Sequence, residues 1–328
     1  MTGRDGIAFL FSAQGTQWPG MGRDLISDDA TFRSVISRCD ESIRRHCDWS
    51  LSHELAAGDD SCRLHDPGLA QPALTALQIA LTETLVDRGL SPDAAGSLSM
   101  GEAAGAYAAG MLSLEDAIDI ACSTAKLAET TLRPGLMAFL GASWPDCTAL
   151  IAGESDRAAV AVELGRQLTV ISGEEQAIRD ILERASARGI ACGPLPLAQA
   201  YHSPDVASLG AGFIERLSGL PSRRGTIPSY SSVTGSMQPV MTAAHCWHIC
   251  SAPSRFYTLA LAMIADGWTR FIEITPHPML TQSVLEAAMQ LGRTVDVHPV
   301  MRRGASASDC LAEAVRRFRD APRRLSLS

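Results

Sequence analysis

Short apolar runs alternate with amphipathic stretches along most of the chain, a pattern typical of an α/β protein. Residues 7–11 (IAFLF) are apolar on both faces, which predicts a buried strand of a parallel sheet. Residues 72–88 carry Leu and Ile at helical spacing and predict a core helix that ends at Gly89. A second strand is expected over 93–98, and the Ala- and Gly-rich segment 101–111 predicts a closely packed helix.

The pattern changes after a further predicted helix over 114–132. Three strand-like segments and two helical ones follow within about sixty residues: 136–140, 144–152, 167–173, 174–188 and 190–197. This β-α-β-α-β order predicts a small subdomain with a ferredoxin-like layout, residues 134–198, inserted into a larger α/β subdomain of residues 1–133 and 199–328. The larger part resumes with a predicted strand over 271–274.

Composition narrows the class of protein. The net charge of −8 over 328 residues argues against a nucleic-acid-binding protein. No apolar run approaches the roughly 20 residues that span a bilayer, and the N-terminus lacks the apolar core of a signal peptide. We therefore expect a cytoplasmic protein with no membrane association and with nine free thiols.

Two local features allow more than one interpretation. His245, Cys246, His248 and Cys250 lie within six residues, but structural zinc sites draw paired ligands from two separated segments, so no metal is expected. The segment 301–328 is rich in arginine on an otherwise acidic chain. It could contact an acidic partner, or it could be the solvated face of a helix.

Candidate chemistry lies where the predicted strands end. The loop over 12–22 is rich in glycine and follows a strand, which is where open α/β sheets bind ligands. Ser99 stands between a strand and the glycine-containing start of a helix, the position of a nucleophile elbow, where the backbone N–H of Met100 can stabilise an oxyanion. The glycine usual two residues before such a serine is replaced here by Ser97. By itself this short motif also fits an ordinary serine.

Six signatures occur in order along nearly the whole chain. They are FLFSAQGTQ at 9–17, AQPAL at 70–74, LSMGE at 98–102, YHSP at 201–204, PSRF at 253–256 and EITPHP at 273–278. Together they resemble the acyl-CoA:acyl-carrier-protein transacylases, a family that comprises malonyl transacylases of fatty-acid synthesis and acyltransferase domains of polyketide synthases. The resemblance implies an α/β-hydrolase-like body with an inserted ferredoxin-like subdomain.

The resemblance also implies roles for particular residues. Ser99 is the expected nucleophile and His202 the general base, with the backbone N–H groups of Gln14 and Met100 forming an oxyanion hole. A backbone carbonyl near Ile249 is expected to orient the histidine. The implied reaction is ping-pong: Ser99 takes an acyl group from a thioester and passes it to the thiol of a phosphopantetheine arm. No other cofactor is implied.

Departures from the family pattern concern the acyl group. Thr124 occupies the position of the arginine that binds the carboxylate of malonyl, and Lys126 faces roughly the opposite side of the predicted helix. Leu98 and Leu164 stand where the family has a histidine and an asparagine. We expect substrate contacts from these positions and their neighbours: Leu98, Thr124, Leu164, Gln199 and Tyr201. A buried carboxylate without its cation is unfavourable, so a neutral and bulkier acyl group is expected.

The leading hypothesis is a discrete, monomeric acyltransferase that acts in trans. It would move a non-carboxylated acyl group, such as an aminoacyl or dipeptidyl group, onto an acyl carrier protein of polyketide biosynthesis. Arg302 and Arg303 are candidates for docking that acidic partner. Four alternatives stay open: an editing hydrolase, a malonyl transferase with an arginine from elsewhere, a non-catalytic carrier-binding module and an inactive copy.

Overall fold

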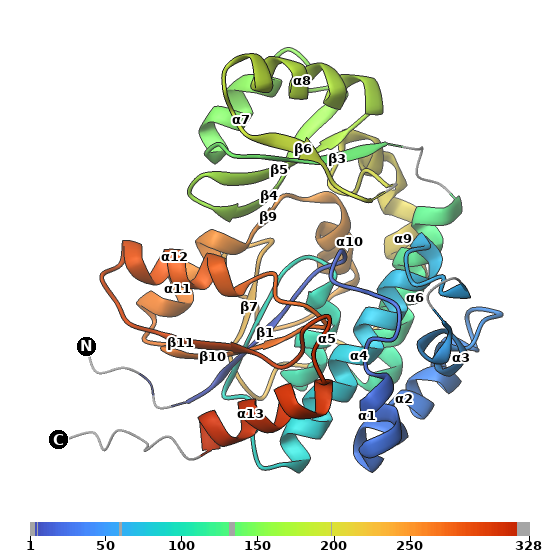
Figure 1. Ribbon diagram of the computed structural model, residues 1–328. Helices are drawn as coiled ribbons and strands as arrows, with labels where there is room; N and C mark the ends of the chain where they lie inside the picture. The colour runs from blue at the N-terminus through green and yellow to red at the C-terminus, as the bar shows by residue number, and fades with distance from the viewer. Residues whose placement is uncertain (1–3, 5, 59–60, 131–134, 198, 320–328) are drawn as a thin grey trace.

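The computed structural model describes residues 4, 6–58, 61–130, 135–197 and 199–319 (Figure 1). Two sheets organise the chain, a six-stranded sheet in the larger part and a five-stranded sheet above it. The residues at which we expected the chain to enter and leave the smaller part, 133–134 and 198, lie outside the described residues.

The six-stranded sheet has the strand order β11-β10-β1-β2-β7-β8. Its strands are β1 (Ala8–Phe11), β2 (Ala94–Ser97), β7 (Ser229–Ser231), β8 (Ser236–Met237), β10 (Arg270–Ile274) and β11 (Asp296–Pro299). All neighbours pair in parallel except β7 and β8. The strands predicted over 7–11, 93–98 and 271–274 are confirmed.

Helices cover both faces of this sheet. They are α1 (Arg23–Asp28), α2 (Ala30–Ile43), α3 (Leu51–Ala56), α4 (Pro67–Asp87), α5 (Gly101–Ala108), α6 (Leu114–Thr130), α9 (Gly210–Arg216), α10 (Ala243–Ser251), α11 (Phe256–Ala265), α12 (Thr281–Gln290) and α13 (Ala307–Arg319), with a 3₁₀ helix at Pro204–Leu209. Side chains of β1 alternate between the two faces. Phe9 and Phe11 join the cluster around α4, and Ala8 and Leu10 join the cluster around α11.

Helix α4 is the central helix of the larger part. It is apolar around almost its whole circumference, which is typical of a helix enclosed by neighbours, and it packs against α2, α5 and α6. It begins at Pro67, five residues earlier than the predicted start, so that Pro72 lies within its second turn. The predicted helices over 101–111 and 114–132 correspond to α5 and α6.

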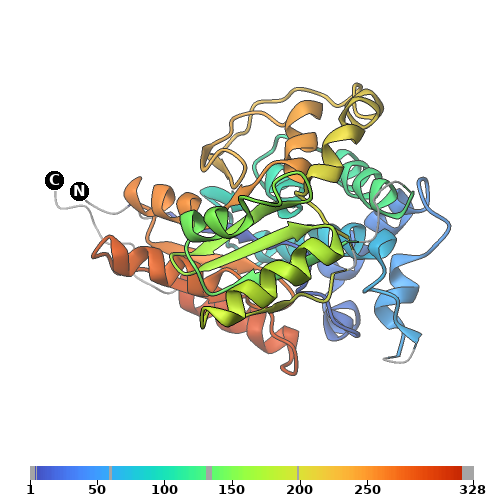
Figure 2. The same ribbon diagram turned by 90° about the horizontal axis from the view of Figure 1, so that it is seen from above.

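The five-stranded sheet has the order β6-β3-β5-β4-β9. It contains β3 (Leu136–Leu140), β4 (Ala158–Gly165), β5 (Leu168–Gly173), β6 (Cys192–Pro194) and β9 (Ser254–Arg255), with α7 (Trp144–Ile151) and α8 (Glu175–Ala187) on its outer face (Figure 2). In chain order, its elements β3, α7, β4, β5, α8 and β6 form a β-α-β-β-α-β unit, which is ferredoxin-like. Three of these strands match the segments predicted over 136–140, 167–173 and 190–197, whereas β4 was not predicted.

Strand β9 connects the two sheets. It follows α10 in the larger part and pairs in parallel with β4, with Val162 opposite Ser254. The Arg255 guanidinium also binds the Glu163 carboxylate of β4 at 3.1 Å. The smaller sheet is therefore attached to the larger part beside the loop that follows α10.

Candidate active site

The turn between β2 and α5 places Ser99 in a strained backbone conformation. Its φ is 48°, and His202 at 61° is the other described non-glycine residue with positive φ. A Cβ at Gly101 would lie 2.6 Å from the Ser12 carbonyl oxygen, so the helix start can approach β1 this closely only with glycine. Strained residues of this kind persist where their surroundings hold them, and here they are the two candidate catalytic residues.

The structure explains how Ser97 replaces the usual glycine of the elbow. Ser97 ends β2 and is buried, with its side chain against Gly105 of α5. A Cβ on Gly105 would overlap the Ser97 hydroxyl. The close contact of strand and helix is thus preserved, because glycine occurs on the helix, at Gly105, and not on the strand, where Ser97 stands.

His202 lies opposite Ser99 and is held by the end of α10. Its Nε2 is 3.1 Å from Ser99 Oγ, and its Nδ1 is 2.6 Å from the Ala252 carbonyl oxygen. The backbone N–H of His202 donates to the Cys250 carbonyl at 2.9 Å. Carbonyls at a helix C-terminus lack intrahelical partners, so these two are available. The orienting carbonyl belongs to Ala252, which corrects the expected position near Ile249 by three residues.

The surroundings of His202 keep it neutral. Burial lowers the pKa of its imidazole from 6.5 to about 4, although the Ala252 carbonyl opposes this shift. Donation from Nδ1–H to that carbonyl leaves Nε2 as the acceptor facing Ser99 Oγ. At neutral pH the pair is therefore arranged for His202 to accept the serine proton.

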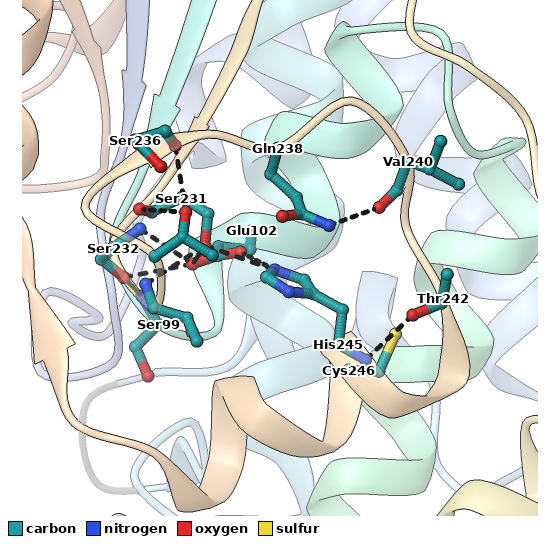
Figure 3. Close-up of polar contacts among 12 residues, drawn as sticks. Ser99, Glu102, Ser231, Ser232, Ser236, Gln238, Val240, Thr242, His245 and Cys246 are labelled. Carbon is teal, nitrogen blue, oxygen red and sulfur yellow. Dashed lines mark hydrogen bonds and ion pairs between the residues drawn. The ribbon is translucent and has the colours of Figure 1, made fainter.

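A buried carboxylate holds the backbone of Ser99 through an intermediate hydroxyl (Figure 3). The Ser99 N–H donates to Ser232 Oγ at 3.0 Å. Ser232 donates to Glu102 Oε1 at 3.1 Å from its hydroxyl and at 3.1 Å from its backbone N–H. Ser231 Oγ binds the same oxygen at 2.8 Å, and His245 Nε2 lies 2.7 Å from Glu102 Oε2. This network holds the backbone of the nucleophile, whereas His202 contacts its hydroxyl.

A cavity of about 880 Å³, including its open mouth, contains both Ser99 and His202. Gln14 and Met100, the predicted oxyanion-hole residues, also line it. Most of the remaining lining is aliphatic or sulfur-containing, and none of the described lining residues is arginine or lysine. A mostly apolar lining with a few polar groups is typical of a small-molecule site.

Comparisons with known proteins agree with this geometry. A family model of the acyl transferase domain matches residues 8–321. The chain belongs to this family. It is 33% identical over 312 residues, 93% of its length, to polyketide synthase GfsE of Streptomyces halstedii, and 31% identical over 300 residues, 90% of its length, to erythronolide synthase EryA2 of Saccharopolyspora erythraea. This acyl transferase chain spans 8% of the length of each.

Solved structures give the same result. A loading acyltransferase from the avermectin modular polyketide synthase is 30% identical, with a TM-score of 0.89, 96% of this chain and 100% of that chain being covered. The acyltransferase domain from module 8 of the salinomycin polyketide synthase is 28% identical, with a TM-score of 0.91, 98% of this chain and 77% of that chain being covered. The expected α/β-hydrolase-like body with a smaller subdomain is confirmed.

The predicted substrate residues of this acyl transferase fall into two groups. Leu98, Thr124, Leu164 and Tyr201 line the cavity, whereas Gln199 is not among its lining residues. The Thr124 hydroxyl donates to the Ile120 carbonyl at 2.9 Å. Lys126 is exposed on α6 and is also outside the lining, as the helical spacing predicted.

Other predicted residues lie away from the cavity. Arg302 and Arg303 are exposed in the loop between β11 and α13, where the Arg303 backbone N–H donates to His277 Nδ1 at 3.3 Å. The cluster on α10 directs His245 to Glu102, and no group of three metal-binding side chains occurs in the described part of the chain. Within the same residues, no helix is long and apolar enough to cross a membrane.

Among the residues of the site that were not predicted from the sequence are the two that hold the Ser99 backbone. Glu102 was noted within the LSMGE signature but was given no role, and Ser232 was not singled out. A buried carboxylate in the first turn of a helix, three residues after a candidate nucleophile, was the available signal. Its partner, 130 residues further along the chain, had no signal of its own.

Proposed function

We propose that this acyl transferase moves a neutral, non-carboxylated acyl group onto an acyl carrier protein of polyketide biosynthesis through an ester on Ser99. One observation carries the substrate class: the described lining of the cavity around Ser99 and His202 contains no arginine or lysine. Thr124 stands in that lining at the position where the family resemblance places the carboxylate-binding arginine.

The first half-reaction forms the acyl-enzyme. His202 Nε2 takes the proton from Ser99 Oγ, and the oxygen attacks the thioester carbonyl. The negative oxygen of the tetrahedral intermediate faces the backbone N–H groups of Met100 and Gln14. Collapse breaks the carbon–sulfur bond, and the thiolate leaves with the proton held by His202. The Ala252 carbonyl stabilises the imidazolium that exists between the two proton transfers.

The second half-reaction transfers the acyl group. The thiol of a phosphopantetheine arm gives its proton to His202 Nε2 and attacks the Ser99 ester. The tetrahedral intermediate collapses with loss of the serine oxygen, which takes the proton back from His202. The arm belongs to the carrier protein and is therefore part of the substrate; the chain itself needs no further cofactor for either step.

The electrostatics of the cavity favour a neutral acyl group. A malonyl carboxylate would leave water for an apolar site without a cation among the described lining residues, at a cost of several kcal/mol. A neutral acyl group avoids this cost. The similarity to a loading acyltransferase over that protein's full length supports a role in supplying a starter group. Aminoacyl and dipeptidyl groups are included when their amines are uncharged or remain at the mouth.

Intact-mass measurement of the purified protein tests the proposal. It is offered malonyl, short-chain acyl and aminoacyl thioesters on coenzyme A and on a carrier protein, with Ser99→Ala as the control. We expect wild-type protein to gain the mass of a neutral acyl group, the control to gain none, and a second carrier to remove the label. Faster labelling by malonyl than by every neutral group would contradict the proposal, and loss of the label to water alone would indicate a hydrolase.

A further inference from the structure

Three polar side chains lie together on one side of the cavity. Gln71 and Thr75 are one turn apart on α4 and so share a face of that helix, and the Tyr201 phenol lies beside Gln71. All three line the cavity, and each is more than nine-tenths buried. They add polar groups to a lining that, apart from Gln14, Thr124 and the catalytic pair, is otherwise apolar or sulfur-containing.

Two of these side chains have a buried hydroxyl without a partner. Thr75 Oγ1 and Tyr201 Oη each lack a hydrogen bond of acceptable geometry to any described residue, although the Tyr201 hydroxyl lies close enough to the Gln71 side chain to interact with it. Buried hydroxyls are nearly always paired, because water is lost on burial and must be replaced. Two orphaned hydroxyls in one cavity therefore indicate a partner that enters from outside the chain.

Other threonines of the same region show that Thr75 is the exception. Thr82 and Thr84 on α4 each donate to the carbonyl four residues earlier, at 2.8 Å, and Thr124 on α6 does the same at 2.9 Å. This bond is the usual solution for a threonine inside a helix. Thr75 does not make it, although the Gln71 carbonyl stands at the matching position.

We propose that Thr75 and Tyr201 bind a neutral hydrogen-bonding group, a hydroxyl or an amide, on the acyl chain attached to Ser99. This inference rests on the proposed function, and it narrows the substrate from neutral acyl groups in general to those with a polar group within the chain. Both side chains donate and accept, so they can bind a hydroxyl, an amide N–H or an amide carbonyl. A site built for such a group discriminates strongly against analogues that lack it.

Matched pairs of N-acetylcysteamine thioesters test the inference. The pairs are 3-hydroxybutyryl with 3-methylbutyryl, and N-acetylglycyl with 4-methylpentanoyl; within each pair a polar group replaces an apolar one of similar shape. The measurement is kcat/KM for acylation of Ser99, followed by intact mass. We expect the polar member of at least one pair to be preferred by about 10-fold or more.

Variants identify the hydroxyls responsible. Thr75→Val and Tyr201→Phe remove one hydroxyl each at nearly constant volume, and each should reduce the preference several-fold. Thr75→Ser, which keeps a hydroxyl, should retain it. Thr82→Val is the matched control, because that hydroxyl is buried on the same helix but bonded to the Gln78 carbonyl; the preference should not change.

The outcomes separate the two proposals. If neutral groups acylate Ser99 but the apolar member of both pairs is preferred, or if Thr75→Val and Tyr201→Phe both leave the ratio unchanged, the polar subsite is overturned and the proposed function stands. If malonyl outpaces all four neutral groups, the proposed function fails and the subsite fails with it.

Discussion

The catalytic end and the acyl-binding end of the one cavity differ in how their polar atoms are satisfied. At the catalytic end, the Ser99 N–H, the Ser232 hydroxyl and both oxygens of Glu102 are hydrogen-bonded, and His202 is bonded through its backbone N–H and through both ring nitrogens. At the acyl end the lining is mostly apolar, and the Thr75 hydroxyl has no partner among the described residues.

This difference in hydrogen bonding suggests separate roles for the two ends: one end holds the catalytic residues, and the other receives the acyl group. The hydrogen bonds around Ser99 and His202 hold two strained residues in one geometry, which suits a reaction whose atoms must meet in the same way each time. The acyl end fixes no charge and leaves hydrogen-bonding capacity unused, which suits a ligand that supplies its own polar group. Contacts within the chain thus hold the catalytic pair, whereas under our proposal the acyl group itself supplies the hydrogen-bonding partner of Thr75.

The largest effect should come from the general base. His202→Ala removes the acceptor of the Ser99 proton and should reduce the rate of acylation by about 10²- to 10⁴-fold, as for other general bases. His248→Ala is the matched control, because His248 is exposed on α10 outside the cavity. Single-turnover labelling of Ser99 measures both variants; equal rates for the two would remove His202 from the mechanism.

The pH profile of acylation should reflect the buried state of the same histidine. The neutral imidazole is the reactive form, and burial lowers its pKa to about 4. As the pH falls from 8, kcat/KM should stay constant past the ordinary histidine pKa of about 6.5 and decline only as the pH approaches about 4. A decline centred on the ordinary value would mean that His202 is solvated in the free enzyme.

One substitution at the acyl end should change the selectivity between malonyl and neutral acyl groups. Thr124→Arg places a guanidinium in the cavity, where it can pair with a malonyl carboxylate in a charge-assisted contact. We expect the ratio of malonyl to neutral acylation to rise by about 10-fold or more. Thr124→Leu, which adds bulk without charge, is the control. A rise of the same size in both variants would show that space, not charge, selects the acyl group.

The catalytic end should respond to loss of the hydroxyl behind the nucleophile. Ser232→Ala leaves the Ser99 N–H without its partner and relaxes the strained turn, so kcat should fall by about 10-fold, in line with one buried hydrogen bond. The KM for the thioester should change little, because Ser232 does not line the cavity. Ser229→Ala, on the strand β7 that Ser232 directly follows, is the control. A change in KM alone would contradict a positioning role.

The parts of the fold that the sequence predicted are those set by local pattern. The strand over 7–11 and the helix over 72–88 have side-chain periods that admit one interpretation each. Strand β4 was missed because its sequence, AAVAVELG, is rich in alanine and contains a buried glutamate, Glu163, whose partner Arg255 comes about ninety residues later. A strand that is buried on both faces lacks the alternation of polar and apolar residues that would reveal it, and β4 is buried almost throughout.

The residues of the candidate site also divide into those that a local sequence pattern predicts and those that only tertiary contacts bring together. Ser99 and His202 were found because each lies in a short recognisable segment, although their positive φ values were not predictable from residue type. The tie from Glu102 to Ser232 depends on the pairing of β2 with β7, which only the folded sheet provides. Tertiary contacts of this kind leave no pattern along the chain.

The smallest effect should lie outside the cavity altogether. We propose that Arg302 and Arg303 contact the acidic surface of a carrier protein; Arg302→Glu with Arg303→Glu should then raise the KM for carrier by about 3- to 10-fold at low salt, with the effect diminishing as salt is added. Arg223→Glu with Arg224→Glu is a matched control, since these arginines form another exposed adjacent pair. Acylation from a small thioester should be unaffected in both double variants. If the two pairs raise KM equally, overall charge accounts for the effect, and the loop before α13 is not the docking surface.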